Sequence, residues 1–250
     1  MRPTPLFSKI ETGAATYDVS DKASYKGIAL KTSLLFLITV LTAVATIVMV
    51  PKAFDGTNIG VLIAGLIIAG IAALVSALVG RLSYRLAMPF SIIYSFAMGF
   101  LLGFISAIVE LAVPGIAMTA VIATLIIFGI MLLLFFTGVI KAGNKIMAIG
   151  LGLLLGAISI TLFTFIMYWT GVIQTTQYLW LLLLIDAIYL IYAVIMLTFN
   201  FAEAAMVVKL GAAKNAEWSV SLGIMSALAY IYIELLRVLL VIASIVGNHS

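Results

Sequence analysis

The sequence predicts an all-α membrane protein, a bundle of seven transmembrane helices. Of its 250 residues, 65% are hydrophobic and 9% are charged, whereas soluble domains carry roughly 45–50% apolar and about 25% charged residues. Seven apolar runs each approach the roughly 20 residues that cross the hydrocarbon core of a bilayer. Runs such as 59–79 are apolar on every face, which excludes the alternating pattern of a membrane β-barrel.

The seven spans follow one another at short intervals. In chain order we predict them at residues 33–50, 59–79, 88–111, 116–137, 146–169, 178–200 and 221–246. The gaps hold turn-forming or charged residues, which are, in the same order, Pro51 with Asp55 and Gly56, Gly80 with Arg81, Pro114 with Gly115, Lys141 to Lys145, Gly171, and Lys209 to Glu217. We predict a polar cytoplasmic tail at 1–30 and one transmembrane domain at 31–250.

The distribution of basic residues predicts the orientation, because lysine and arginine are enriched in cytoplasmic loops. Loops on the opposite side hold only Lys52, and Arg237 lies within the last span. Eleven basic residues fall in the tail and the even-numbered loops, namely Arg2, Lys9, Lys22, Lys26, Lys31, Arg81, Arg85, Lys141, Lys145, Lys209 and Lys214. We therefore expect a multi-pass protein of the cell membrane with the N-terminus in the cytoplasm and the C-terminus outside.

Three ionisable residues lie inside the last two spans, Asp186 in span six and Glu234 and Arg237 in span seven. Each costs roughly 2.5–3.5 kcal/mol or more to insert. At 1.5 Å per residue, all three fall within a slice roughly 6 Å thick, and Glu234 and Arg237 share a helical face. The cluster is either a structural ion pair that ties the two spans together or a gate that senses protons and cations. Arg237 could pair with Asp186, Glu234 or both, and one acid in excess could titrate.

Other polar and small residues in the spans have simpler interpretations. Thr198, Asn200 and Glu203 fall where the inner ends of spans six and seven meet, and we expect Glu203 to be a solvated loop residue. Two GxxxG patterns, Gly99 with Gly103 and Gly152 with Gly156, are expected to allow close helix packing.

Several classes of function are poorly supported. The chain has no cysteine and one histidine, His249, so a thiolate nucleophile or thiolate metal site is excluded. Motifs of zinc proteases, serine hydrolases and phosphate-binding loops are absent from the sequence. The net charge of +4 is explained by basic cytoplasmic loops rather than by nucleic-acid binding. We expect neither an enzyme nor a cofactor.

Three segments, in the right order, resemble the Bax inhibitor-1-like family of multi-pass membrane proteins in its bacterial branch. The last span, EWSVSLGIMSALAYIYIELLRVL at 217–239, is similar to that family's tryptophan-to-arginine signature. Residues 98–141 are similar to its glycine-rich third span, Pro-Gly turn and lysine-terminated fourth span. Residues 26–40, KGIALKTSLLFLITV, resemble the lead into the first span.

The resemblance implies a fold whose last helix is central and a pH-sensitive calcium leak, gated by two acids on spans six and seven. Glu234 matches the acid on span seven, and the partner acid should fall near Thr198 or Asn200, where this chain has no carboxylate. Met98 also stands where the branch has a glutamate. Two functions remain open: an acid-sensitive leak for calcium or other cations, with Glu234, Asp186, Arg237, Asn200 and Thr198 in its pathway or gate, and a non-transporting regulator that binds other membrane proteins or a membrane protease.

Overall fold

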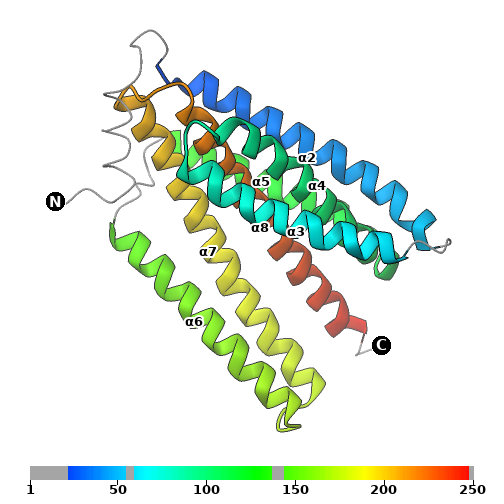
Figure 1. Cartoon of the computed structure of the whole chain (residues 1–250). Helices are drawn as coiled ribbons and strands as arrows, with labels where there is room; N and C mark the ends of the chain where they lie inside the picture. The colour runs from blue at the N-terminus through cyan, green and yellow to red at the C-terminus, as the bar shows by residue number, and fades with distance from the viewer. Residues whose placement is uncertain (1–21, 55–58, 137–143, 248–250) are drawn as a thin grey trace. The chain divides into compact units, whose positions relative to one another are not determined.

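The computed structural model describes residues 22–54, 59–136 and 144–247, which form helices and no strand. Four predicted features lie outside these ranges, namely the tail up to residue 21, the turn-forming residues Asp55 and Gly56, the loop around Lys141, and His249. In chain order (Figure 1) the helices are α2 (Tyr25–Phe54), α3 (Ile59–Leu82), α4 (Ala87–Ala112), α5 (Ile116–Phe136), α6 (Asn144–Trp169), α7 (Thr175–Lys209) and α8 (Ala216–Gly247).

All seven predicted spans are confirmed as helices long and apolar enough to cross a membrane. The largest boundary differences lie at two helix ends. α2 begins at Tyr25 rather than at residue 33, and α7 continues to Lys209 rather than ending at residue 200. Both extensions carry charged residues, and both are held by ion pairs with distant parts of the chain, described below.

The helices divide into two compact units. Of the described residues, unit 1 comprises those within 22–107 and 200–226, and unit 2 comprises those within 108–199 and 227–247. Three helices therefore contribute to both units: α4 passes into unit 2 at residue 108, α7 passes into unit 1 at residue 200, and α8 passes into unit 2 at residue 227.

Unit 1 is built around small residues that bring helices close together. Its core contains Leu35 of α2, Ala69 and Ala73 of α3, Tyr94 and Ala97 of α4, and Leu222 and Met225 of α8. A Cβ on Gly99 would lie 2.6 Å from the Thr39 carbonyl oxygen, and one on Gly103 would lie 2.5 Å from that of Ala43. The predicted packing role of this GxxxG pair is confirmed, since α4 approaches the backbone of α2 only because both side chains are absent.

Unit 2 contains the antiparallel pair α6 and α7. Ala157, Ile185 and Tyr189 form its buried cluster, and the Tyr189 hydroxyl lies 3.2 Å from that of Thr161. Gly171, with φ of 72°, supplies the left-handed residue of the turn between the helices. The predicted packing role of Gly152 and Gly156 is not found among the described residues, because a Cβ at either would meet no atom within 4 Å.

The two glycine pairs therefore predict opposite effects of the same substitution. We expect Gly103→Ala to destabilise the protein by about 1–3 kcal/mol, because the added methyl must push α2 and α4 apart. Gly152→Ala is the matched control and should be neutral or stabilise by up to about 1 kcal/mol, since alanine favours the helix. Thermal unfolding of the purified protein in detergent measures both. Equal unfolding temperatures for the two variants would contradict the packing described for α2 and α4.

Candidate functional site

The three charged residues predicted to meet inside the membrane do so in unit 2. Arg237 Nη2 of α8 lies 2.7 Å from Asp186 Oδ1 of α7, and Arg237 Nη1 lies 3.4 Å from both carboxylate oxygens of Glu234. Glu234 and Arg237 are one helical turn apart, so their contact follows from helix geometry. The sequence left open which acid pairs with Arg237, and the answer is both.

The two carboxylates are buried and the arginine is not. Asp186 is 1% exposed and Glu234 is 2% exposed, whereas the Arg237 side chain keeps 41% of its surface accessible. Arg237 and Asp186 form an ion pair without a hydrogen bond, because their charged atoms are close but Asp186 Oδ1 accepts no hydrogen bond. With both acids ionised, the cluster carries two negative charges against one positive charge.

Tyrosines surround this cluster. The Arg237 guanidinium lies 5.7 Å from the ring centroid of Tyr189, at the distance of a cation–π contact. Tyr230 lies one helical turn before Glu234 on α8, and its ring meets Tyr192 edge-on, with centroids 6.1 Å apart. Tyrosines of both α7 and α8 therefore lie beside the charged cluster.

The remaining predicted site residues have other partners. Asn200 belongs to unit 1, where its side-chain oxygen accepts a 2.7 Å hydrogen bond from Arg81 Nη2. The Thr198 hydroxyl, in unit 2, donates to the Val194 carbonyl at 3.0 Å, an ordinary local bond of a threonine within a helix. Of the five residues predicted for one pathway or gate, Asp186, Glu234 and Arg237 form the unit 2 cluster. Asn200 is instead bound to Arg81 of α3, and Thr198 bonds within its own helix.

The prediction that Glu203 is a solvated loop residue is wrong. Glu203 lies within α7, and its side chain, 16% exposed, forms a 2.9 Å ion pair with Arg81. Because Glu203 follows Asn200 by three residues, both side chains face Arg81 from one side of the helix. Burial, assisted by the Glu203 carboxylate, raises the pKa of Tyr84 in the turn after α3. α8 admits this cluster because a Cβ on Gly223 would lie 2.6 Å from Arg81 Nη2.

A third charged group, which the sequence did not single out, joins the start of α8 to the start of α2. Glu217 is 1% exposed, and its carboxylate accepts hydrogen bonds from Lys31 Nζ at 2.7 Å and from the Ser24 amide at 2.7 Å. A Cβ on Gly27 would overlap this carboxylate. We call Ser24, Gly27, Lys31 and Glu217 the α2–α8 clamp. In the sequence, the feature that could have pointed to this clamp is Glu217 beside Trp218, at the start of the last span.

One further acid, Glu110 in unit 2, has a structural role at the start of α5. Its carboxylate accepts hydrogen bonds from the amides of Gly115 at 2.7 Å and Ala117 at 3.3 Å. These contacts satisfy amides at the start of α5 that have no partner within the helix. Among the described residues, no group of three or more His, Cys, Asp or Glu side chains could hold a metal ion.

Comparison with known proteins agrees with the resemblance drawn from the sequence. The family model described as Bax inhibitor 1 like matches residues 4–244. No curated protein and no solved structure matches the chain. The match covers nearly the whole chain, including six of the seven apolar helices in full and α8 as far as residue 244. The protein is therefore a multi-pass membrane protein that belongs to the Bax inhibitor-1-like family.

Proposed function

We propose that this protein is a leak channel for calcium or other cations whose gate is the Asp186–Arg237–Glu234 cluster. The observation that carries the proposal is a single guanidinium held between two buried carboxylates, one on α7 and one on α8. Ionisable residues are expensive in a membrane and typically mark ion pathways, proton relays or sensors. Three of them in contact favour such a role over packing alone.

The charge balance of the cluster gives it a response to acid. When Asp186 and Glu234 are both ionised, the cluster has a net charge of −1, and Arg237 ties the two helices together. Protonation of either carboxylate makes the cluster neutral and removes one of the two ion pairs. α7 and α8 then lose part of their electrostatic connection in unit 2. We infer that acid favours the conducting state.

The same cluster suits passage of a cation better than its capture. Carboxylate oxygens are the ligands that calcium prefers, but a tight calcium site takes six to eight oxygen ligands. The cluster has only two carboxylates, and Arg237 occupies both. Conduction requires binding weak enough for the ion to leave, so a partly neutralised pair of acids fits a leak.

The test is calcium flux into dye-loaded proteoliposomes at neutral and mildly acidic pH. We expect wild-type flux above that of empty liposomes and higher flux in acid. Because Glu234→Gln imitates the protonated acid, it should raise the flux at neutral pH by about five-fold or more, the change that a typical coupling free energy produces. It should also weaken the response of the flux to pH. Glu110→Gln is the matched control, since Glu110 caps α5, and it should respond to pH like the wild type.

The alternative function is a non-transporting regulator that binds other membrane proteins or a membrane protease. It is favoured by Asn200, which stands where the family resemblance places a titratable acid and is held by Arg81. If neither wild type nor Glu234→Gln conducts above empty liposomes at either pH, the channel is rejected. Crosslinking of the protein in native membranes would then be expected to capture a membrane-protein partner.

The proposed orientation places the N-terminus in the cytoplasm and the C-terminus outside, in the cell membrane. It is supported by the eleven basic residues predicted on one side against one in the loops of the other. Because the chain has no cysteine, a single introduced thiol reports its own side. Lys214→Cys should not react with an impermeant maleimide added to intact cells. Labelling of this cysteine would show that the orientation is the reverse of the one proposed.

A further inference from the structure

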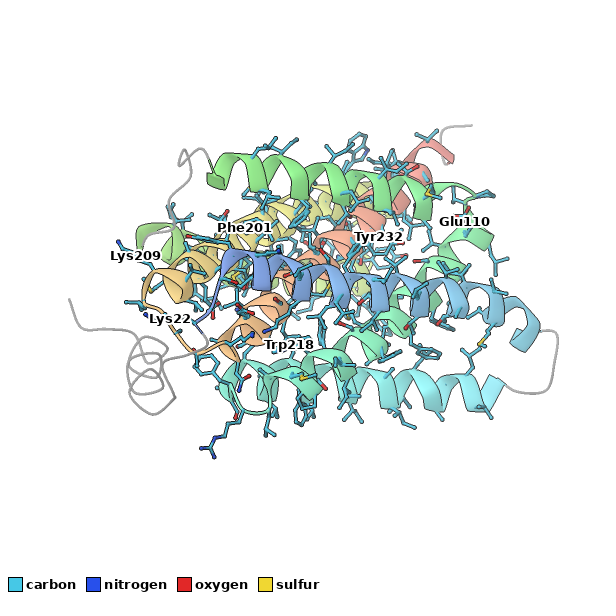
Figure 2. All side chains as sticks on the ribbon, turned by 90° about the horizontal axis from the view of Figure 1, so that it is seen from above. Lys22, Glu110, Phe201, Lys209, Trp218 and Tyr232 are labelled. Carbon is cyan, nitrogen blue, oxygen red and sulfur yellow. The ribbon has the colours of Figure 1, made fainter. Side chains whose placement is uncertain are left out.

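At one end of unit 1, the start of α2 contacts the turn between the end of α7 and the start of α8. The Ala23 amide donates a 2.8 Å hydrogen bond to the Ala212 carbonyl in the turn between α7 and α8, and Lys22 bridges Ala213 in the same turn. Figure 2 shows Lys22, Lys209 and Trp218 at this end. Residues 22–24, just before α2, therefore lie against the α7–α8 turn.

The acidic groups at this end are turned inward and neutralised. Glu217 is bound by Lys31, which also donates to the Lys214 carbonyl at 3.1 Å and lies 5.1 Å from the Trp218 ring centroid. Glu203 is paired with Arg81. Each acid that the structure describes in unit 1 thus has a basic partner within the protein.

Among the residues that the structure describes at this end, the exposed charge is basic. Lys22, Lys26 and Lys209 are exposed, and we call them the basic rim. Lys26 lies in the first turn of α2, and Lys209 is the last residue of α7. The aliphatic part of the Lys22 side chain lies beside Gly211 in the α7–α8 turn, since a Cβ added to Gly211 would be 3.6 Å from Lys22 Cδ. The rim therefore gathers around the α7–α8 turn.

The depth of the rim selects its partner. The candidate span of α2 begins at Tyr25 and that of α7 ends at Lys209, and we infer that the rim lies in or just beyond the headgroup layer. Tyr25, between Lys22 and Lys26, is 51% exposed, and tyrosine is enriched at that layer. Clustered lysines immediately beyond an apolar span attract anionic lipids.

We propose that the basic rim binds the phosphate headgroups of anionic phospholipids in the surrounding bilayer. Lysine is a compact, strongly hydrated charge on a flexible stem, which suits a mobile headgroup. The α2–α8 clamp supports the site, because it fixes Lys22 and Lys26 against the turn that follows Lys209. Since Glu217 is buried within the clamp, its negative charge does not face the headgroups.

The test is native mass spectrometry of the purified protein with phosphatidylglycerol or phosphatidylcholine of identical acyl chains. Each lysine near an anionic surface is worth about a five-fold change in binding constant at moderate salt. We expect the wild type to prefer phosphatidylglycerol by at least about ten-fold. The triple variant Lys22→Gln, Lys26→Gln, Lys209→Gln should lose most of this preference, whereas Lys52→Gln, at the far end of α2, should keep it.

Two controls keep the result interpretable. The rim side chains are exposed, so the triple variant should unfold at the wild-type temperature. Added inorganic phosphate should displace phosphatidylglycerol only at concentrations that also act through ionic strength, as sodium chloride would. The proposal is overturned if the triple variant keeps the preference, if the wild type shows none, or if phosphate competes specifically, since the rim would then be a site for a free anion.

Discussion

Arg237→Met is expected to destabilise the protein by about 3–5 kcal/mol, the usual cost of leaving buried charges without their partner. Arg237 is the only basic residue in contact with Asp186 and Glu234 among the ion pairs of the described residues. Without it, two acids that are 1% and 2% exposed would lie on neighbouring helices with no opposite charge. The unfolding temperature in detergent measures the loss.

Two companion variants separate lost charge from lost packing. Arg237→Lys keeps the charge but cannot form the planar fork between two carboxylates, so its unfolding temperature should fall between those of the wild type and Arg237→Met. Replacing Asp186 by Asn and Glu234 by Gln in the Arg237→Met background removes all three charges and should recover most of the stability. A triple variant no more stable than Arg237→Met would show that the cluster's charges are not what its stability depends on.

Glu217→Gln is expected to cost about 2–4 kcal/mol, because Lys31 would lose its carboxylate while remaining largely buried. The Lys31 side chain is 15% exposed, and that of Glu217 is 2% exposed. The glutamine would still accept a hydrogen bond from the Ser24 amide, so the loss isolates the charge. Thermal unfolding in detergent, compared with the exposed-site variant Lys26→Gln, measures it.

Lys31→Met completes a double-mutant cycle for the α2–α8 clamp. If Lys31 and Glu217 act as a pair, the double variant should be more stable than the sum of the single losses predicts, with an interaction energy of about 1–3 kcal/mol. Additive losses would mean that each side chain acts through its other contacts, namely Ser24 for Glu217 and Trp218 for Lys31.

The helices were predictable because each carries its own signal. A run of apolar residues long enough to cross a bilayer needs no tertiary information, and all seven runs are helical. The turns at Gly115 and Gly171 were also local, since both glycines adopt a positive φ. The central position of the last helix, which only the family resemblance implies, stays a prediction.

The helix ends that were missed depend on partners far away in the chain. α2 begins at Tyr25 because its first turn is held by Glu217, 193 residues from Ser24. α7 continues past residue 200 because Glu203 meets Arg81, 122 residues away. Hydrophobicity placed the ends of these two spans beside Lys31 and Glu203, and it cannot show that such a charge is neutralised by another helix.

The candidate site divides along the same line. The Asp186–Arg237–Glu234 cluster was predicted, because helical rise and the spacing of Glu234 and Arg237 place three charges at one depth. Asn200 was expected in the same pathway or gate, yet its partner is Arg81. The spacing of Asn200 and Glu203 could have marked them as one face, but nothing in the sequence identified Arg81 as the residue opposite.

The central claim is that Arg237, shared between two carboxylates, makes cation flow sensitive to acid. The most direct measurement is the current through planar bilayers that contain the wild type or the Asp186→Asn, Glu234→Gln double variant, recorded at neutral and mildly acidic pH. We predict a wild-type cation current that rises on acidification and a double-variant current that is the same at both pH values. A double variant that conducts and keeps the wild-type response to acid would contradict the claim.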